Sequence, residues 1–131
     1  MIKRILVTGA NGQLGKTIRD SSFETKTNLD FVFVSKDELD ITEEDNLNTF
    51  FNNNSFDYCI NCAAYTNVEQ SEKTPEIAYN INANGVKSLA QSCLKHDIVL
   101  IHISTDYVFD GEKDTPYEIC DETNPVNEYG N

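Results

Sequence analysis

Two kinds of apolar run alternate along the chain. Short runs of aliphatic and β-branched residues predict strands at 4–8, 30–34, 39–41, 57–64 and 98–103. Apolar residues at helical spacing between them predict helices over 12–21, from Thr42 through Phe51, and from Thr74 to Leu94. This alternation predicts a Rossmann-like fold: an open, doubly wound parallel sheet in three α/β/α layers. After Ser104 the pattern fades into turns.

The last predicted strand, Ile98–Ile103, is apolar at every position except His102. Such a run suits a parallel sheet that is covered on both faces, so His102 is interpreted as a hydrogen-bonded core residue rather than a catalyst. We expect this strand to present an open edge. At the second helix, Thr42 is predicted to cap the amino terminus with its side-chain oxygen.

Length and composition are typical of one globular domain spanning residues 1–131. The chain is 39% hydrophobic and 24% charged, and its net charge is -12. The acidity disfavours nucleic acid as a partner, and no apolar run approaches the ~20 residues of a membrane helix. The apolar stretch at the amino terminus ends at Thr8, short of a secretory signal. We therefore expect a cytoplasmic protein that is not bound to a membrane.

Four cysteines occur, two of them in the spacing of a metal or redox pair at Cys59 and Cys62. Residues three apart on a strand point to opposite faces of the sheet. No second pair lies nearby to complete a zinc site. Buried free thiols are the favoured interpretation, and no metal site is predicted.

Glycine recurs at every third position in the segment Gly9-Ala10-Asn11-Gly12-Gln13-Leu14-Gly15, which follows the first strand and opens the first helix. The first glycine permits a tight turn, the second permits close approach of a pyrophosphate, and the third permits close packing of the helix on the sheet. Backbone N–H groups at the helix start can then hold phosphate without a lysine. An ordinary glycine turn without a ligand is the alternative.

The end of the second strand normally selects between NAD and NADP. An acidic residue there binds the ribose 2′-hydroxyl of NAD, but Ser35 and Lys36 occupy the expected place and Asp37 comes late. Ser35 and Lys36 could accept a 2′-phosphate, which favours NADP. The alternative is that Lys36 is a solvated loop lysine.

Several motifs carry a resemblance to a known family. The three-residue glycine spacing resembles that of the extended short-chain dehydrogenase/reductases. Three longer segments, followed by Asn124-Pro125 and Tyr129-Gly130, resemble the dTDP-4-dehydrorhamnose reductase family over the whole chain. These segments are Asn61-Cys62-Ala63-Ala64-Tyr65-Thr66, Asn82-Ala83-Asn84-Gly85 and Ser104-Thr105-Asp106-Tyr107-Val108-Phe109-Asp110-Gly111.

The resemblance implies reduction of the C4 ketone of dTDP-4-dehydrorhamnose by NADPH or NADH, which gives dTDP-rhamnose. Tyr129 would donate the proton, Thr105 would bond the reacting oxygen, and Asp106 would lie in the same sugar pocket. Independently, Thr105 follows the carboxyl end of a predicted strand, where ligands of such sheets bind. Alternatively, the Thr105 hydroxyl caps a helix or stabilises a turn, and Tyr129 is a packing or surface residue.

The resemblance also implies a set of residues that contact the cofactor, with Asp40 and Ile41 near the adenine. The full set is Gly9, Asn11, Gly12, Gln13, Leu14, Gly15, Ser35, Lys36, Asp40, Ile41, Ala63, Ala64, Tyr65, Asn82, Ser104 and Tyr129. The implied partner is the dTDP-sugar substrate, and the full-length protein is expected to form a homodimer.

One element of the family pattern falls outside the sequence. A lysine is expected four positions after Tyr129, two residues beyond Asn131, where it would lower the pKa of the tyrosine. We therefore expect an incomplete domain that is inactive or nearly so by itself. Two alternatives stay open: a non-catalytic NADP-binding regulator, and another nucleotide-sugar reductase or epimerase of the same superfamily.

Overall fold

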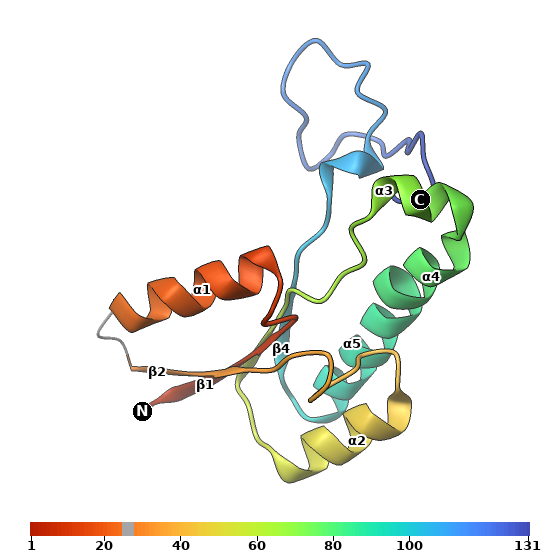
Figure 1. Ribbon diagram of the computed structural model, residues 1–131. Helices are drawn as coiled ribbons and strands as arrows, with labels where there is room; N and C mark the ends of the chain where they lie inside the picture. The colour runs from red at the N-terminus through yellow and green to blue at the C-terminus, as the bar shows by residue number, and fades with distance from the viewer. Residues whose placement is uncertain (25–27) are drawn as a thin grey trace.

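An open sheet of four parallel strands forms the centre of the computed structural model, which describes residues 1–24 and 28–131 (Figure 1). The strands are β1 (Lys3–Thr8), β2 (Leu29–Phe33), β3 (Tyr58–Asn61) and β4 (Val99–His102). Their order across the sheet is β2-β1-β3-β4. The chain therefore changes direction across the sheet between β1 and β3, and in sheets of this kind ligands bind at such a switch point.

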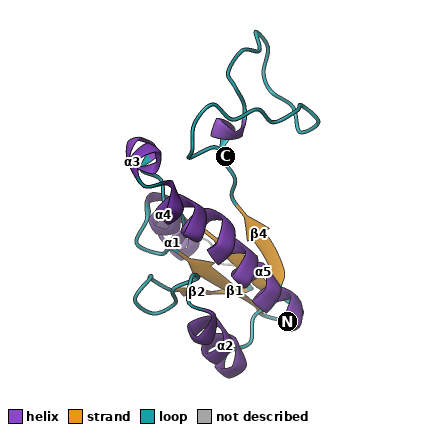
Figure 2. Cartoon of the chain, turned by 90° about the vertical axis from the view of Figure 1, so that its right-hand side faces the viewer, coloured by secondary structure: helices purple, strands orange, loops and turns teal. Residues whose placement is uncertain are grey.

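Helices cover both faces of the sheet, which confirms the predicted Rossmann-like α/β fold. They are α1 (Gln13–Glu24), α2 (Glu44–Asn53), α3 (Val68–Lys73), α4 (Pro75–Tyr79), the π-helix η1 (Asn80–Gly85), α5 (Val86–Lys95) and the 3-10 helix η2 (Asp106–Val108). In Figure 2, α5 crosses in front of the sheet and α1 lies behind it. Of the helices in the described residues, none is long and apolar enough to cross a membrane.

The main core lies between the sheet and the pair α2 and α5. Leu6 and Cys59 are paired in register on β1 and β3 and are both fully buried. Leu47 of α2 and Leu89 of α5 are fully buried in the same cluster. The helical spacing that predicted α2 therefore also identifies the side of the helix that packs inward.

The segment between β2 and α2 differs from its prediction. Residues 39–41 form part of a loop instead of a strand, although Leu39 and Ile41 are both buried. The apolar residues at these positions anchor a loop in the core, a role that a short run cannot distinguish from a strand. The expected cap is also wrong: Glu43 is the N-cap without a side-chain bond, and the Thr42 hydroxyl donates to Asp40.

β4 is covered on one face only, so the prediction of a strand buried on both faces is wrong. Ile101 and Ile103 remain 44% and 49% exposed. His102 is exposed rather than buried, although its ring is hydrogen-bonded. The open edge is confirmed: in the described part of the chain, β4 has β3 on one side and no strand on the other.

The segment after β4 forms a long loop that projects beyond the sheet (Figure 1). One organising side chain is Asp110, whose carboxylate accepts hydrogen bonds from Tyr117 at 2.9 Å and Asn124 at 3.0 Å. The hydrogen bond from the Glu112 backbone N–H, followed by those from Asn124 and Tyr117, holds the pKa of Asp110 below its ordinary value. A second carboxylate, Asp121, accepts from Lys113 and from the Glu118 N–H, so the turns predicted after Ser104 are ordered by two carboxylates and the donors around them.

Candidate functional site

Three parallel strands end at the same edge of the sheet and bring a polar row together there. Thr8 of β1, Asn61 of β3 and His102 of β4 are paired in register. The Thr8 hydroxyl donates to Asn61 Oδ1 at 2.6 Å, and Asn61 Nδ2 lies 3.1 Å from His102 Nδ1. Partial burial lowers the pKa of His102, so its ring is held neutral beside the amide. This row ties the three strand ends together where a ligand of such a sheet would lie.

The glycine turn follows Thr8, the first residue of this polar row, directly in the chain. Gly9 has φ +62°, and a Cβ there would lie 2.6 Å from the backbone of Cys62 and Ala63. A side chain at Gly15 would lie 2.6 Å from the Gly9 carbonyl oxygen. The first glycine thus permits the turn, and the third permits α1 to start against it, as the sequence predicted.

A cavity of about 260 Å³ lies beside the glycine turn. The predicted cofactor residues that line it are Gly9, Asn11, Gly12, Ser35, Lys36, Asp40, Ile41, Ala63 and Ala64. Four further residues line it that were not predicted to contact the cofactor: Asp37, Leu39, Cys62 and Ile81. The structure thus brings together segments that follow β1, β2 and β3.

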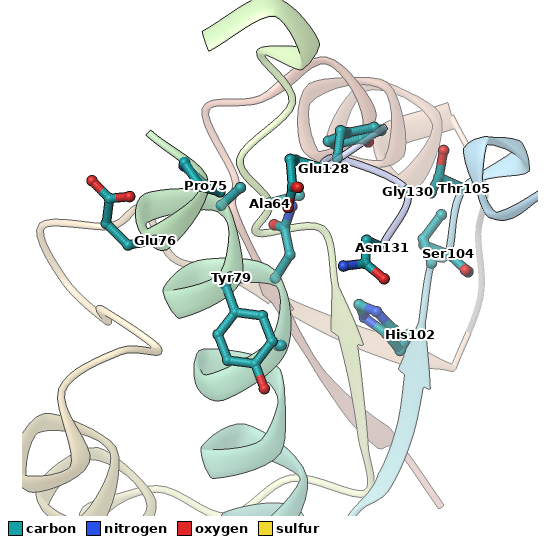
Figure 3. Close-up of a pocket in the computed structure, with 15 residues that line it drawn as sticks. Ala64, Pro75, Glu76, Tyr79, His102, Ser104, Thr105, Glu128, Gly130 and Asn131 are labelled. Atoms are coloured by element: carbon teal, nitrogen blue, oxygen red, sulfur yellow. The ribbon is translucent and has the colours of Figure 1, made fainter. Parts of the chain in front are cut away.

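A second cavity, of about 420 Å³, shares the lining residue Ala64 with the first. Five predicted residues line it: Ala64, Asn82, Ser104, Thr105 and Tyr129. Figure 3 shows Tyr79 of α4 on one side of this cavity and His102 and Thr105, from β4 and the segment after it, on the other. The two cavities meet at Ala64, on the side of the sheet where the parallel strands end.

Five predicted residues line neither cavity: Gln13, Leu14, Gly15, Tyr65 and Asp106. Gln13, Leu14 and Gly15 form the first turn of α1, where backbone N–H groups lack partners within the helix. They can therefore contribute to an anion site through the backbone. Asp106 is exposed at the start of η2, beside Thr105 but outside the cavity.

Thr105 and Tyr129 are both held by the loop after β4. The Thr105 hydroxyl accepts a hydrogen bond from the Tyr107 N–H at 3.2 Å and caps η2. The hydroxyl therefore caps η2, and its proton is donated to Asp106 Oδ1 over a long 3.5 Å contact. The Tyr129 ring packs edge-on against Tyr107, with 5.3 Å between ring centroids. The sequence separates Thr105 and Tyr129 widely, and the loop places both on the same cavity.

Asn82 is positioned by an irregular helix. The sequence predicted one regular helix from Thr74 to Leu94, but residues Asn80–Gly85 form a π-helix. The Asn82 side chain bonds both backbone groups of Tyr65, accepting from its N–H and donating to its carbonyl, each at 2.8 Å. π-Helical turns often occur at functional sites, and this one connects the long helix to the segment that follows β3.

Two residues of the site, Asn61 and His102, were not predicted as site residues, although each carries a signal in the sequence. Asn61 ends the strand Tyr58–Asn61, in which Tyr58 is half-buried. The Asn61 side chain is polar and only 1% exposed. A polar residue at the carboxyl end of an apolar strand is a reasonable candidate for a site. His102 carries the same signal on β4, and it lines the larger cavity.

The comparisons with known proteins agree with this geometry. A family model described as the RmlD substrate binding domain matches residues 3–131. The chain belongs to this family. A dTDP-4-dehydrorhamnose reductase from Mycolicibacterium smegmatis is 45% identical over 131 residues, which are 99% of this chain and 39% of the relative.

Two further members illustrate the range of the similarity. The crystal structure of the Bacillus anthracis dTDP-4-dehydrorhamnose reductase in complex with NADP is 37% identical, with a TM-score of 0.93 over 99% of this chain and 46% of that one. A dTDP-4-keto-6-deoxy-D-glucose reductase from Streptomyces niveus is 35% identical over 99% of this chain and 44% of the relative. The chain thus spans less than half the length of these RmlD-family relatives.

Proposed function

We propose that this chain is the NAD(P)H-binding part of a dTDP-4-dehydrorhamnose reductase. The observation that carries the proposal is the pair of adjoining cavities, one lined by Gly9 of the glycine turn and the other by Thr105 and Tyr129. The relatives named as dTDP-4-dehydrorhamnose reductases, one of them crystallised with NADP, support this assignment. Because the chain spans less than half of these relatives, we assign the reduction itself to the full-length protein.

The residues of the smaller cavity fit a dinucleotide. The Gly9 turn leaves no side chain between the strand ends and the start of α1, so a pyrophosphate can approach the backbone N–H groups there. Asp40 and Ile41 would lie at the adenosine end, and Ala63 and Ala64 would lie along the ribose and pyrophosphate. When bound, the reduced nicotinamide would supply the hydride.

The residues of the larger cavity fit the sugar and its proton transfer. Tyr129 would donate its phenolic proton to the oxygen that becomes an alkoxide at C4. Thr105 would bond the same oxygen by turning its hydroxyl proton away from the long contact with Asp106 Oδ1, while the hydroxyl oxygen keeps accepting from the Tyr107 N–H. His102 would line the larger cavity as a neutral imidazole that is hydrogen-bonded to Asn61.

The expected partner is the dTDP-sugar, and homodimerisation of the full-length protein is part of the proposal. The net charge of -12 supports a small-molecule substrate rather than nucleic acid. The cytoplasm, where nucleotide sugars and reduced NAD(P)H are available, is the proposed compartment.

The test is turnover of dTDP-4-dehydrorhamnose by the full-length protein that the gene encodes. The reaction is monitored through the loss of absorbance of the reduced nicotinamide. Tyr129→Phe is expected to lower kcat by about 10²- to 10⁴-fold, the usual contribution of a proton donor. Tyr117→Phe is the matched control, because it removes a tyrosine hydroxyl that bonds Asp110 outside both cavities.

The outcomes separate the candidate functions. Binding of NADPH without turnover of any keto sugar would favour a regulatory subunit. Preference for dTDP-4-keto-6-deoxy-D-glucose over dTDP-4-dehydrorhamnose would favour the activity named for the Streptomyces niveus relative. Equal activity of the wild-type and Tyr129→Phe proteins would refute the role given to Tyr129.

A further inference from the structure

The backbone of Glu128, the residue before Tyr129, is held by a helix from a distant part of the chain. The Glu128 N–H donates to Glu72 Oε1 at 2.7 Å. Glu72 lies on α3, 56 positions earlier in the sequence. A hydrogen bond from a backbone N–H to an ionised carboxylate is shorter and stronger than one between neutral groups. This bond therefore ties the segment that carries Tyr129 to α3.

The backbone on the other side of Tyr129 is fixed as well. The Gly130 N–H donates to Asn127 Oδ1 at 2.8 Å, which closes a turn around Tyr129. A Cβ at Gly130 would collide with the carbonyl group of Tyr107, so the missing side chain lets this turn lie close against Tyr107. The Tyr107 ring packs edge-on against the Tyr129 ring. In this arrangement, the bond to Glu72 is the contact that reaches Tyr129 from outside the loop after β4.

The helix that carries Glu72 is a firm anchor, although it is short. The Asn67 side chain caps α3 by accepting from the Gln70 N–H at 2.9 Å. Ser71, the neighbour of Glu72, is fully buried, and its hydroxyl donates to the Asn67 carbonyl at 2.8 Å. The position of the Glu72 backbone is therefore set by the packing of α3.

Glu72 connects two segments of the larger cavity without lining it. The helix α3 leads directly into α4, from which Pro75 and Tyr79 line this cavity. The residues from Glu128 to Asn131 also line it. Glu72 lines neither this cavity nor the smaller one. An effect of Glu72 on the reaction must therefore pass through the residues that it holds.

We propose that Glu72 is the positioning residue for Tyr129. Its carboxylate holds the Glu128 backbone, and this contact keeps the Tyr129 hydroxyl at the place in the larger cavity where it donates its proton. Proton transfer requires the donor within hydrogen-bond distance of the acceptor, and a displacement of about 1 Å can lower a rate about 10²-fold. This inference rests on the proposed role of Tyr129 in the reduction.

The first test is the kinetics of the full-length protein with dTDP-4-dehydrorhamnose and either NADPH or NADH. Glu72→Ala should lower kcat by about 10- to 10²-fold, since Tyr129 is no longer held in place. The KM for the coenzyme should stay close to that of the wild type, because Glu72 does not line the coenzyme cavity. Glu72→Gln keeps an acceptor oxygen for the Glu128 N–H and should recover most of the lost kcat.

Glu69→Ala is the matched control. It removes the same charge from the same helix, at a side chain that bonds Lys73 rather than the Tyr129 segment. This variant should keep the kcat of the wild type. Equal losses of kcat in Glu69→Ala and Glu72→Ala would overturn the proposal, because the charge or stability of α3 would then explain both.

A double variant separates positioning of Tyr129 from a general structural role. In the Tyr129→Phe background the phenolic proton is absent, so adding Glu72→Ala should lower kcat little further. Losses that multiply in the double variant would overturn the positioning role, since Glu72 would then act independently of Tyr129.

Hydrogen exchange of the Glu128 amide tests the contact itself, without substrate. In Glu72→Ala this amide should exchange about tenfold faster than in the wild type, because it loses its acceptor, and in Glu69→Ala its rate should not change. Unchanged exchange in Glu72→Ala would overturn the role of Glu72 while leaving the proposed function intact. A wild type that turns over no keto sugar would refute the proposed function, and the positioning role of Glu72 would fail with it.

Discussion

At the residue scale, single side chains in this protein act through partners that are distant in the sequence. Asn61 shows this most clearly, because its amide joins Thr8 on one neighbouring strand to His102 on the other. The same amide oxygen also accepts from Ala63 N–H at 3.2 Å. Such a network is stable when all its groups are paired, and in the described residues no buried side-chain nitrogen or oxygen lacks a partner.

The His102 contact makes stability depend on pH. Partial burial lowers the pKa of His102 below the ordinary value of about 6.5. In the window between the lowered folded pKa and 6.5, the unfolded chain binds more protons. The free energy of unfolding from this group is therefore fully present above about pH 6.5 and is lost as the pH falls toward the folded pKa.

Urea unfolding at about pH 5.5 and about pH 7.5 measures this dependence. His102→Asn keeps an acceptor for Asn61 but cannot be protonated, so the difference between the two pH values should be smaller than in the wild type. His96→Asn, which removes the other histidine, is the control. A difference reduced equally by both substitutions would contradict the assignment to His102.

At the scale of elements, the long helical segment from Pro75 to Lys95 has two functions. Its amino-terminal half lines the larger cavity through Tyr79 and Asn82. Its carboxyl-terminal half packs on the sheet through Leu89 and Cys93. The π-helix contains Asn82 and leads directly into α5, and a side chain at Gly85 in it would approach Ile41 to 3.0 Å. The sequence predicted the helix but not this irregular turn, because the close approach of Ile41 is a tertiary contact.

The packing function of α5 is testable with two leucines of the same helix. Leu89 is fully buried and Leu94 is 80% exposed. Leu89→Ala should lower the free energy of unfolding by about 2–5 kcal/mol, because it leaves a cavity between α5 and the sheet. Leu94→Ala should change it by less than about 0.5 kcal/mol. Similar losses in both variants, measured by urea unfolding, would show that α5 does not pack as described.

At the scale of the whole molecule, the uncovered side of β4 promotes association between chains and the net negative charge opposes it. Val99 and Ile101 are 55% and 44% exposed beside an open strand edge, a combination that promotes pairing between chains. The net charge of -12 separates the chains at low ionic strength. The balance between the two is therefore set by salt.

We expect the chain to self-associate increasingly as salt is raised from about 0.01 M to about 0.5 M, because the Debye length falls severalfold. Light scattering of size-separated samples measures the mass. Ile101→Lys should suppress the association by placing a charge on the exposed face of β4. Ile119→Lys, on the fully exposed outer loop, should not suppress it. A mass that is independent of salt, or equal suppression by both variants, would contradict this expectation.

The sequence alone determined the features that depend on a few neighbouring residues. The strands and helices follow from apolar spacing, and the phosphate turn follows from Gly9, Gly12 and Gly15. These predictions succeed because backbone sterics and helix geometry act within one or two turns of chain. The identity of the segments from Ser104 to Tyr129 as site residues came from resemblance, and their catalytic roles stay predictions.

Only the tertiary structure decided which groups meet. It placed Asn61 against His102 on an exposed strand end, turned the expected strand at 39–41 into an anchored loop, and folded Glu38 back onto Ser35. The first of these results depends on contacts between residues about 40 positions apart, and the other two depend on a loop whose path is set by burial of Leu39 and Ile41. Such contacts arise from competition among packing alternatives across the whole chain, which no local pattern can rank.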